Sequence, residues 1–273
     1  MYQPGYNANT LELKSSILIS TNTATRTYTG INAGGWTVIH DKDLDSNVYY
    51  SMNSGSRALS RIALVKGGTT ATISTMYTYS GLTSQVLGAC YAPACMWSTS
   101  SNATGAFIIA GFSSGAIAVL EFNAQKVVST TYTVNYTSEV YGTEIIPRAA
   151  SGFTYDFGVA YTRGSRQMSS WTVDMPARSW TNRTDNSYIN GTNGPANGDG
   201  MIYYPAGKPI YTNDPDTTFN RIAMNDTSTS VLYVWRITQS GTALVWTFLR
   251  TVPMAHTGGY PYQMSHKALS SII

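Results

Sequence analysis

The residues best suited to chemistry in this chain are a few carboxylates beside apolar segments. Asp41 or Asp43, Glu144 and Asp199 lie near the starts or ends of stretches that are predicted to be strands. Glycoside hydrolysis needs a carboxylic acid and a second carboxylate about 5–10 Å apart. No recognisable motif surrounds these residues, however, and the chain has 14 Asp and Glu residues in total, so three near strands do not define an active site.

A run of alternating acids could bind calcium. Asp41, Asp43 and Asp45 form a D-x-D-x-D pattern, but the sixth and twelfth positions of a calcium-binding loop, normally Gly and Glu, are Ser46 and Met52. We therefore predict a solvated loop here, with a calcium site as the alternative.

The remaining reactive side chains do not form a familiar catalytic set. There is no G-x-S-x-G elbow and no G-x-x-x-x-G-K-[ST] phosphate loop. Cys90 and Cys95 are too few for a zinc site, which needs about four ligands; we favour free thiols, with a short-loop disulfide left open. The three histidines are predicted to be surface residues: His40, His256 and His266. The sequence thus predicts no catalytic residue, no metal ligand and no cofactor, and leaves the ligand-binding residues unknown.

Composition narrows the class of protein. Charged residues make up 11% of the chain, against about 25% in a typical soluble domain. The 17 basic residues are scattered, whereas a nucleic-acid-binding protein normally shows a basic stripe. No apolar run approaches the roughly 20 residues of a membrane-spanning helix, and the N-terminus lacks the pattern of an export signal. We therefore expect no nucleic-acid partner and no membrane insertion.

Short β-rich segments recur along the chain and no convincing helix is present. An apolar strand followed by a turn and a Thr/aromatic strand occurs five times, between residues 16–30, 61–81, 116–134, 169–184 and 231–251. The apolar strands align on Ile17, Ile62, Val119, Trp171 and Val234.

Two further strands precede the apolar strand in each internal repeat. The nearer ones are predicted at 47–52, 105–111, 155–161 and 219–224, and the earlier ones at 36–40, 85–92, 143–149 and 200–206. Four strands every 40–50 residues or so is the pattern of a propeller blade. The stretch 182–199, rich in Asn and Gly, is predicted to be a long surface loop.

In this pattern the chain resembles the β-propellers, although it has no WD, kelch or Asp-box motif. The resemblance implies an all-β fold, with residues 1–273 forming a single five-bladed propeller of four-stranded antiparallel blades. Residues 11–30 and Met264–Ile273 would then share the closing blade, which removes a free sheet edge. A β-sandwich and a mixed β-barrel are the alternatives.

Function is predicted mainly from composition. The low charge and abundant Thr, Ser, Asn, Gly and Tyr resemble phage and virus structural proteins. We therefore expect a non-enzymatic virion-associated structural or adhesion propeller, extracellular or on the virion, whose partners are other virion or assembly proteins and host-surface glycans. A lectin-type propeller is the alternative, because exposed Tyr and Trp rings can stack on sugars. A glycoside hydrolase-like propeller is the second alternative. Five N-x-[ST] sequons are present, at Asn102, Asn135, Asn182, Asn190 and Asn225.

Overall fold

The computed structural model describes most of the segments that the sequence predicts as strands. The described residues are 35–40, 48–53, 55–64, 71–92, 106–122, 127–174, 179–180, 184–188, 194–210, 213–226, 228–229 and 231–253.

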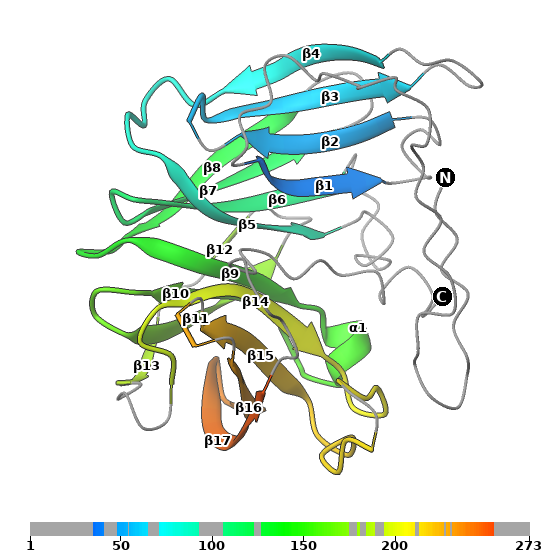
Figure 1. Ribbon diagram of the computed structural model, residues 1–273, viewed down its shortest axis with the longest axis vertical. Helices are drawn as coiled ribbons and strands as arrows, with labels where there is room; N and C mark the ends of the chain where they lie inside the picture. Colours follow the sequence, from blue (N-terminus) through cyan, green and yellow to red (C-terminus); the bar gives the residue numbers. More distant parts are fainter. Residues whose placement is uncertain are drawn as a thin grey trace.

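These residues form four antiparallel sheets, each built from consecutive strands (Figure 1). The first contains β1 (Gly35–His40), β2 (Val48–Asn53), β3 (Ala58–Leu64) and β4 (Ala71–Thr78). The second contains β5 (Val86–Ala92), β6 (Ala106–Phe112), β7 (Ala116–Phe122) and β8 (Val127–Asn135). The third contains β9 (Val140–Ile146), β10 (Asp156–Thr162), β11 (Gln167–Asp174), β12 (Ser179–Trp180) and β13 (Thr184–Tyr188). The fourth contains β14 (Gly198–Tyr204), β15 (Arg221–Asp226), β16 (Val231–Ser240) and β17 (Ala243–Pro253).

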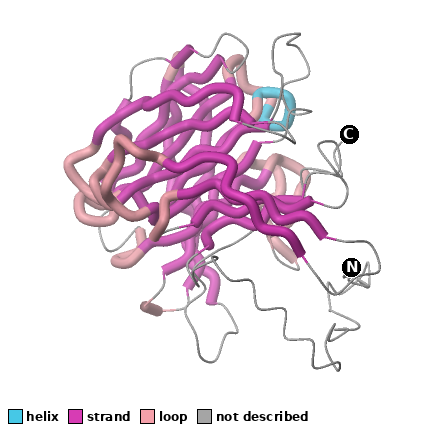
Figure 2. The backbone as a smooth tube through the Cα atoms, turned by 90° about the horizontal axis from the view of Figure 1, so that it is seen from above, coloured by secondary structure: helices cyan, strands magenta, loops and turns pink. Residues whose placement is uncertain are grey.

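Each sheet is a propeller blade, and we number them blades 1 to 4. The first strand of each blade lies against the first strand of the next, since β1 contacts β5, β5 contacts β9 and β9 contacts β14. These inner strands run in the same direction, from left to right in Figure 1. Their starting ends therefore share one face of the molecule, which we call the entry face. In Figure 2 connecting loops gather at the left, on this face, and the one described helix lies toward the other end.

Three of the four apolar clusters among the described residues lie between blades, and the fourth lies on blade 4. Tyr50 and Leu59 of blade 1 pack in one cluster with Ile108 and Phe112 of blade 2. A second cluster joins blades 2 and 3, and a third joins blades 3 and 4. Since successive side chains of a strand point to opposite faces of a sheet, each blade buries both of its faces. All seven residues of β7 and of β10 are accordingly buried.

Polar side chains on β9 also join the blades. The Thr143 hydroxyl donates a hydrogen bond of 3.1 Å to the Ile109 carbonyl oxygen in blade 2. The next residue points the other way, and Glu144 Oε2 accepts a 3.1 Å hydrogen bond from the Tyr203 backbone N–H in blade 4. One inner strand therefore connects three blades.

The predicted all-β fold with four-stranded antiparallel blades is confirmed. The alignment positions Ile62, Val119, Trp171 and Val234 all fall in the third strand of a blade, namely β3, β7, β11 and β16. The number of blades does not follow from the described residues, because Ile17 and the closing segments 11–30 and 264–273 lie outside them.

Three local predictions need correction. The inner strand of blade 3 begins at Val140, three residues before the predicted start, and ends before Pro147. Pro147 precedes a single helical turn, α1 (Arg148–Ser151), where the sequence shows no helical pattern. The predicted loop 182–199 contains β13 and the first residues of β14. No helix in the described part of the chain is long and apolar enough to cross a membrane.

The packing of Trp171 against a glycine generates a stability prediction. Gly158 is the register partner of Trp171, and a Cβ atom at Gly158 would lie 2.4 Å from the indole ring. Trp171 is fully buried and cannot move aside without displacing the cluster between blades 2 and 3. We expect Gly158→Ala to lower the free energy of unfolding by about 1–3 kcal/mol, the usual cost of overpacking a core.

Chemical denaturation measures this loss, and Gly142→Ala is the matched control. A Cβ at Gly142 would come no closer than 3.3 Å to its neighbours, the Met201 side chain at 3.3 Å and the Tyr161 Cβ at 3.4 Å, and the terminal methyl of Met201 can shift. Equal losses in the two variants would contradict the role assigned to the indole ring.

Candidate acid-base site

The structure brings two of the predicted carboxylates onto neighbouring inner strands. Glu144 lies in β9 and Asp199 in β14, and the two strands are in contact. Asp41, Asp43 and Asp45 lie outside the described residues, so the calcium alternative stays a prediction. His256, His266 and Cys95 also lie outside them, and the state of the two thiols stays a prediction.

The hydrogen bonds of Glu144 indicate a structural role. Its side chain is 3% exposed, and its two carboxylate oxygens accept hydrogen bonds from separate backbone amides, Ile145 N–H at 2.8 Å and Tyr203 N–H at 3.1 Å. A carboxylate whose oxygens are both bound by fixed amides is poorly placed to exchange protons with a substrate. Glu144 therefore holds blade 3 to blade 4.

Asp199 has a different environment, at the entry face. Its side chain is 2% exposed, and Oδ1 accepts a 2.8 Å hydrogen bond from the Gly200 backbone N–H. Oδ2 is buried and accepts no hydrogen bond from any described residue. A buried carboxylate oxygen without a donor is energetically costly, and in native structures such atoms are rare enough to suggest a function.

Arg163 is the charged partner of Asp199. It follows β10 directly, and its Nη2 atom lies 3.7 Å from Asp199 Oδ2, too far for a hydrogen bond. Nη2 donates instead to the Gly198 carbonyl oxygen at 3.3 Å. The guanidinium carbon lies 3.4 Å from the centroid of the Tyr141 ring, a cation–π contact that orients the group. The Arg163 side chain is 23% exposed, so it forms the layer between Asp199 and solvent.

Electrostatics favour the protonated form of Asp199. Burial raises the pKa of its carboxyl to about 7, against the smaller opposing effects of the Gly200 N–H and the Arg163 charge. Burial also raises the pKa of the Tyr141 hydroxyl. Near neutral pH Asp199 can therefore either take up or release a proton, the property required of a general acid or base.

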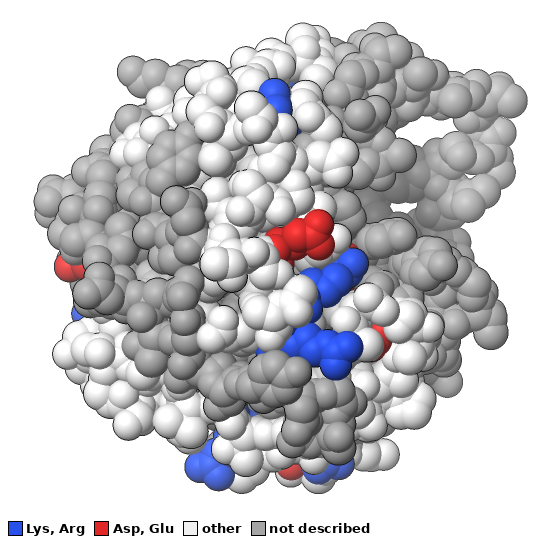
Figure 3. Space-filling model, turned by 90° about the vertical axis from the view of Figure 1, so that its left-hand side faces the viewer, with Lys and Arg blue, Asp and Glu red and all other residues white. Residues whose placement is uncertain are grey.

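The surrounding residues complete the site. The Tyr161 hydroxyl donates to the Pro195 carbonyl oxygen at 3.2 Å, and burial raises the pKa of Tyr161 to about 12. Asp226, the register partner of Gly198, accepts hydrogen bonds from Ala196 N–H, Ser228 N–H and the Ser228 hydroxyl. These donors outweigh burial and lower the pKa of Asp226. Acidic and basic side chains adjoin near the middle of this face in Figure 3.

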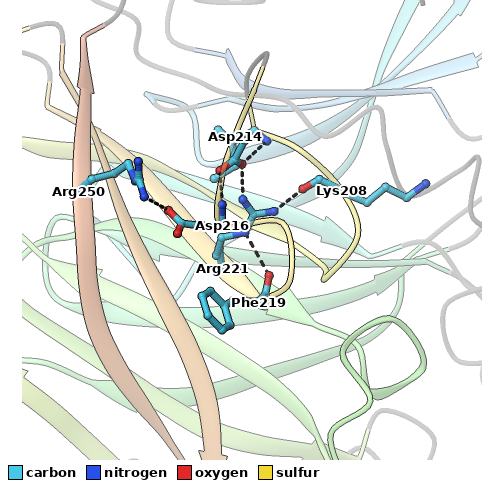
Figure 4. Close-up of polar contacts among 7 residues, drawn as sticks. Lys208, Asp214, Asp216, Phe219, Arg221 and Arg250 are labelled. Atoms are coloured by element: carbon cyan, nitrogen blue, oxygen red, sulfur yellow. Dashed lines mark hydrogen bonds and ion pairs between the residues drawn. The ribbon is translucent and has the colours of Figure 1, made fainter.

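A second charged cluster, on blade 4, lies beyond the opposite end of β14 (Figure 4). Arg221 is fully buried; its Nε donates to the Phe219 carbonyl oxygen at 3.1 Å, and its other nitrogens bind Asp214 and the Lys208 carbonyl oxygen. Asp216 forms a 2.6 Å ion pair with Arg250. Every guanidinium nitrogen of Arg221 has a partner, so Arg221 anchors the segment between β14 and β15.

Sequence reasoning identified Asp199 as an inner-strand carboxylate but missed Arg163 and Tyr141. A signal was present, because two arginines in four residues, Arg163 to Arg166, directly follow a buried strand in a chain with few charges. Among the described residues no three His, Cys, Asp or Glu side chains come together as a metal site. The sequon at Asn225 lies in β15 and its asparagine is fully buried, which is incompatible with a glycan in the folded protein.

Comparison with known proteins gives a fold but no family. No protein-family model and no curated protein sequence matches the chain. A solved structure from Bacteroides uniformis, provisionally named 6-phosphogluconolactonase, matches with a TM-score of 0.50 at 10% identity, covering 78% of this chain and 53% of that one. A protein from Bacteroides fragilis with the same provisional name gives 0.48 at 12% identity, over 80% and 55% of the two chains. The β-propeller domain of Cps50 (Swd1) from Myceliophteria thermophila gives 0.41 at 6% identity, over 78% and 58%.

The class of protein is therefore a β-propeller, and the chain spans about half the length of the matched chains. At these identities the likeness concerns the fold alone. The predicted virion-associated structural or adhesion role is wrong, because the propeller from Bacteroides uniformis to which the chain is similar carries the name of an enzyme, 6-phosphogluconolactonase. Composition misled here for a physical reason: Thr, Tyr and Ser are the residues from which half-buried blades are built, whatever the protein does.

The hydrogen bonds of Glu144 predict a loss of stability on mutation. Glu144→Gln replaces one acceptor oxygen by an NH2 group, which leaves either the Ile145 or the Tyr203 N–H buried without an acceptor. We expect the free energy of unfolding to fall by about 1–3 kcal/mol. Urea denaturation measures it, with the exposed Asp174→Asn as control, for which we expect a change within about 0.5 kcal/mol. A Glu144→Gln protein as stable as the wild type would contradict the inter-blade role.

The raised pKa of Asp199 predicts an unusual pH dependence of stability. The folded protein binds this proton up to about pH 7, whereas an unfolded Asp releases it near 3.8. Because the folded state then holds more protons, the Asp199 contribution to the free energy of unfolding decreases as pH rises from 4 to 7, by at most about 4 kcal/mol.

Asp199→Asn isolates this contribution, since an amide does not titrate. We expect the variant to gain stability relative to the wild type between pH 5 and pH 8, measured by urea denaturation at both values. A constant difference between the two proteins would mean that Asp199 ionises normally in the fold.

Proposed function

We propose that this chain is a propeller enzyme of hydrolase type that uses Asp199 as a general base at the entry face. The observation that carries the proposal is the buried Asp199 carboxyl, whose pKa of about 7 and unpaired Oδ2 are combined with a guanidinium 3.7 Å away. A general base works best when its pKa lies near the working pH. The structural carboxylates Asp214 and Asp226 have a lowered pKa instead.

A cyclic ester, or lactone, is the substrate class that we propose. Asp199 takes a proton from water as the water oxygen attacks the ester carbonyl carbon. Arg163 and the Tyr141 hydroxyl stabilise the negative charge that develops on the carbonyl oxygen. The ring C–O bond then breaks, and the proton held by Asp199 passes to the leaving alkoxide, which gives a hydroxy acid. The provisional name of the two bacterial propellers, 6-phosphogluconolactonase, supports a lactone as the first substrate to test.

The position of Arg163 affects how water or a substrate can reach Asp199. Its guanidinium separates Asp199 from solvent but forms no hydrogen bond with the carboxylate. Water or a substrate oxygen that enters between the two side chains therefore has to replace only a long electrostatic contact and one 3.3 Å hydrogen bond from Arg163 to the Gly198 carbonyl oxygen. Hydrogen bonds at unliganded active sites are often long and shorten when substrate binds.

Hydrolysis of glucono-δ-lactone and 6-phosphogluconolactone, followed by proton release after subtraction of the spontaneous rate, tests the proposal. A general base acts when ionised, so kcat/KM should rise as pH increases through about 7 and then level off. Asp199→Asn should lower kcat by about 10²–10⁴-fold, the usual contribution of a general base.

Asp174→Asn is the matched control, since the same substitution at the far end of β11 should leave the rate unchanged. A folded wild-type protein without activity on either lactone, or an Asp199→Asn variant with full activity, would refute the proposal.

A further inference from the structure

The turn between β10 and β11 concentrates positive charge at the entry face. Residues 163–166 read Arg-Gly-Ser-Arg, and both arginines are half-buried. The Arg166 backbone N–H donates to the Arg163 carbonyl oxygen at 3.2 Å, which closes the turn. A hydrogen bond of 2.5 Å between the Thr162 and Ser165 hydroxyls holds it further.

Arg166 adopts a backbone conformation that arginine rarely takes. Its φ of 50° lies in the left-handed region, where non-glycine residues are uncommon. Such conformations persist where the surrounding structure enforces them, and they cluster at ligand sites. Here the conformation places a second guanidinium on the turn that carries Arg163.

The two arginines lie on one four-residue turn, and the charges of both lower the pKa of the Tyr161 hydroxyl against the larger effect of burial. Both also retain unused donors. Arg163 Nε is buried without a hydrogen-bond partner. In the part of the chain that the structure describes, the Arg166 side chain takes part in no ion pair and no hydrogen bond. Buried N–H groups without acceptors are rare in native structures.

The acids that face these arginines leave positive charge uncompensated. Asp226 is occupied by backbone and hydroxyl donors, and Glu139 is exposed to solvent. Asp199 is about half protonated near neutral pH, because burial raises its pKa to about 7. The Tyr141 hydroxyl is neutral there and can donate a hydrogen bond.

We propose that the turn Arg163–Arg166 binds a tetrahedral dianion, a phosphate or sulfate group, through the two guanidinium groups. The inference names a group that the substrate of the proposed hydrolase would carry, and so it rests on that function for its role. Binding itself needs no turnover and is measured separately. Arginine suits the role, since its planar donor pairs match the oxygens of such an anion.

Binding should be linked to a proton. A dianion bound at this turn adds negative charge beside Asp199 and favours its protonated form, so the Asp199 carboxyl takes up a proton as the anion binds. Affinity should therefore decrease as pH rises through 7. Glu139 and Asp226 contribute little to this linkage, because Glu139 is exposed and the pKa of Asp226 is lowered.

Calorimetric titration of the full chain with sodium sulfate tests the proposal, because sulfate stays divalent from pH 6 to pH 8 and any pH dependence belongs to the protein. We expect saturable binding to the wild type that weakens several-fold between pH 6 and pH 8. Arg166→Asn should weaken it at least about 10-fold, the loss of one charged hydrogen bond. Asparagine tolerates the left-handed conformation, so this variant should fold.

Two further variants and a second ligand complete the experiment. Asp199→Asn should bind sulfate with no pH dependence, and Arg148→Gln in α1, at the far end of the inner strands, should bind like the wild type. Tighter binding of glucose 6-phosphate than of sulfate, with no binding of glucose, would indicate a phosphate carried on a substrate. Equal affinities would indicate a free oxyanion.

The proposal fails if the folded wild type does not bind sulfate, or if Arg166→Asn and Arg148→Gln weaken binding equally. Sulfate binding without lactone hydrolysis would refute the proposed function and leave the anion site standing. Hydrolysis without sulfate binding would do the reverse.

Discussion

The structure depends on one geometric constraint, the alternation of side chains along the inner strands. The inner strands β5 and β9 each lie between two neighbouring blades, and consecutive residues must suit opposite partners. On β9, Thr143 bonds to blade 2 while Glu144 bonds to a backbone amide of blade 4. The apolar residues follow the same rule, since Ile145 packs toward blade 2 and Ile146 toward blade 4. A blade edge that would otherwise expose polar groups is thus joined to its neighbours by hydrogen bonds and apolar contacts together.

The same constraint creates the candidate site. Asp199 lies at the start of β14. Tyr161 and Arg163 of blade 3 pack beside it there, and its side chain is buried from solvent. The protein shows how much the surroundings of a carboxylate decide its behaviour. Asp214 and Asp226 each receive several donors and have lowered pKa values, while Asp199 receives one and has a raised pKa. Burial raises the pKa of all three carboxyls, and at Asp214 and Asp226 the donors together outweigh it.

Much of the fold could be predicted because its signals are local. The pattern of apolar strands separated by turn residues correctly predicted the third strand of each described blade, from Ile62 in β3 to Val234 in β16. The start of β9 was misplaced because Tyr141, Gly142 and Thr143 lack an apolar alternation, and their burial comes from Met201 and other residues of neighbouring blades. β13 was not predicted because its sequence, TDNSY, is polar. It forms a strand by pairing with β11, which its own residues do not indicate. The site was harder still: Asp199 lies 36 residues from Arg163 in the chain, and only ring-like packing brings them together.

In a chain with so few charges, the state of each buried charge is informative. Two buried or half-buried arginines can be compared directly. Arg163 follows β10 in blade 3, and Arg221 begins β15 in blade 4. Arg221 has its nitrogens bound by Phe219, Lys208 and Asp214, so folding alone explains its burial. Arg163 keeps a buried Nε without an acceptor beside Asp199, whose Oδ2 lacks a donor. The two unsatisfied atoms lie on the side chains of one ion pair too long for a hydrogen bond, which is the arrangement expected where a ligand supplies the missing partners. The polar groups that the fold leaves unpaired therefore point to function more directly than the composition of the chain does.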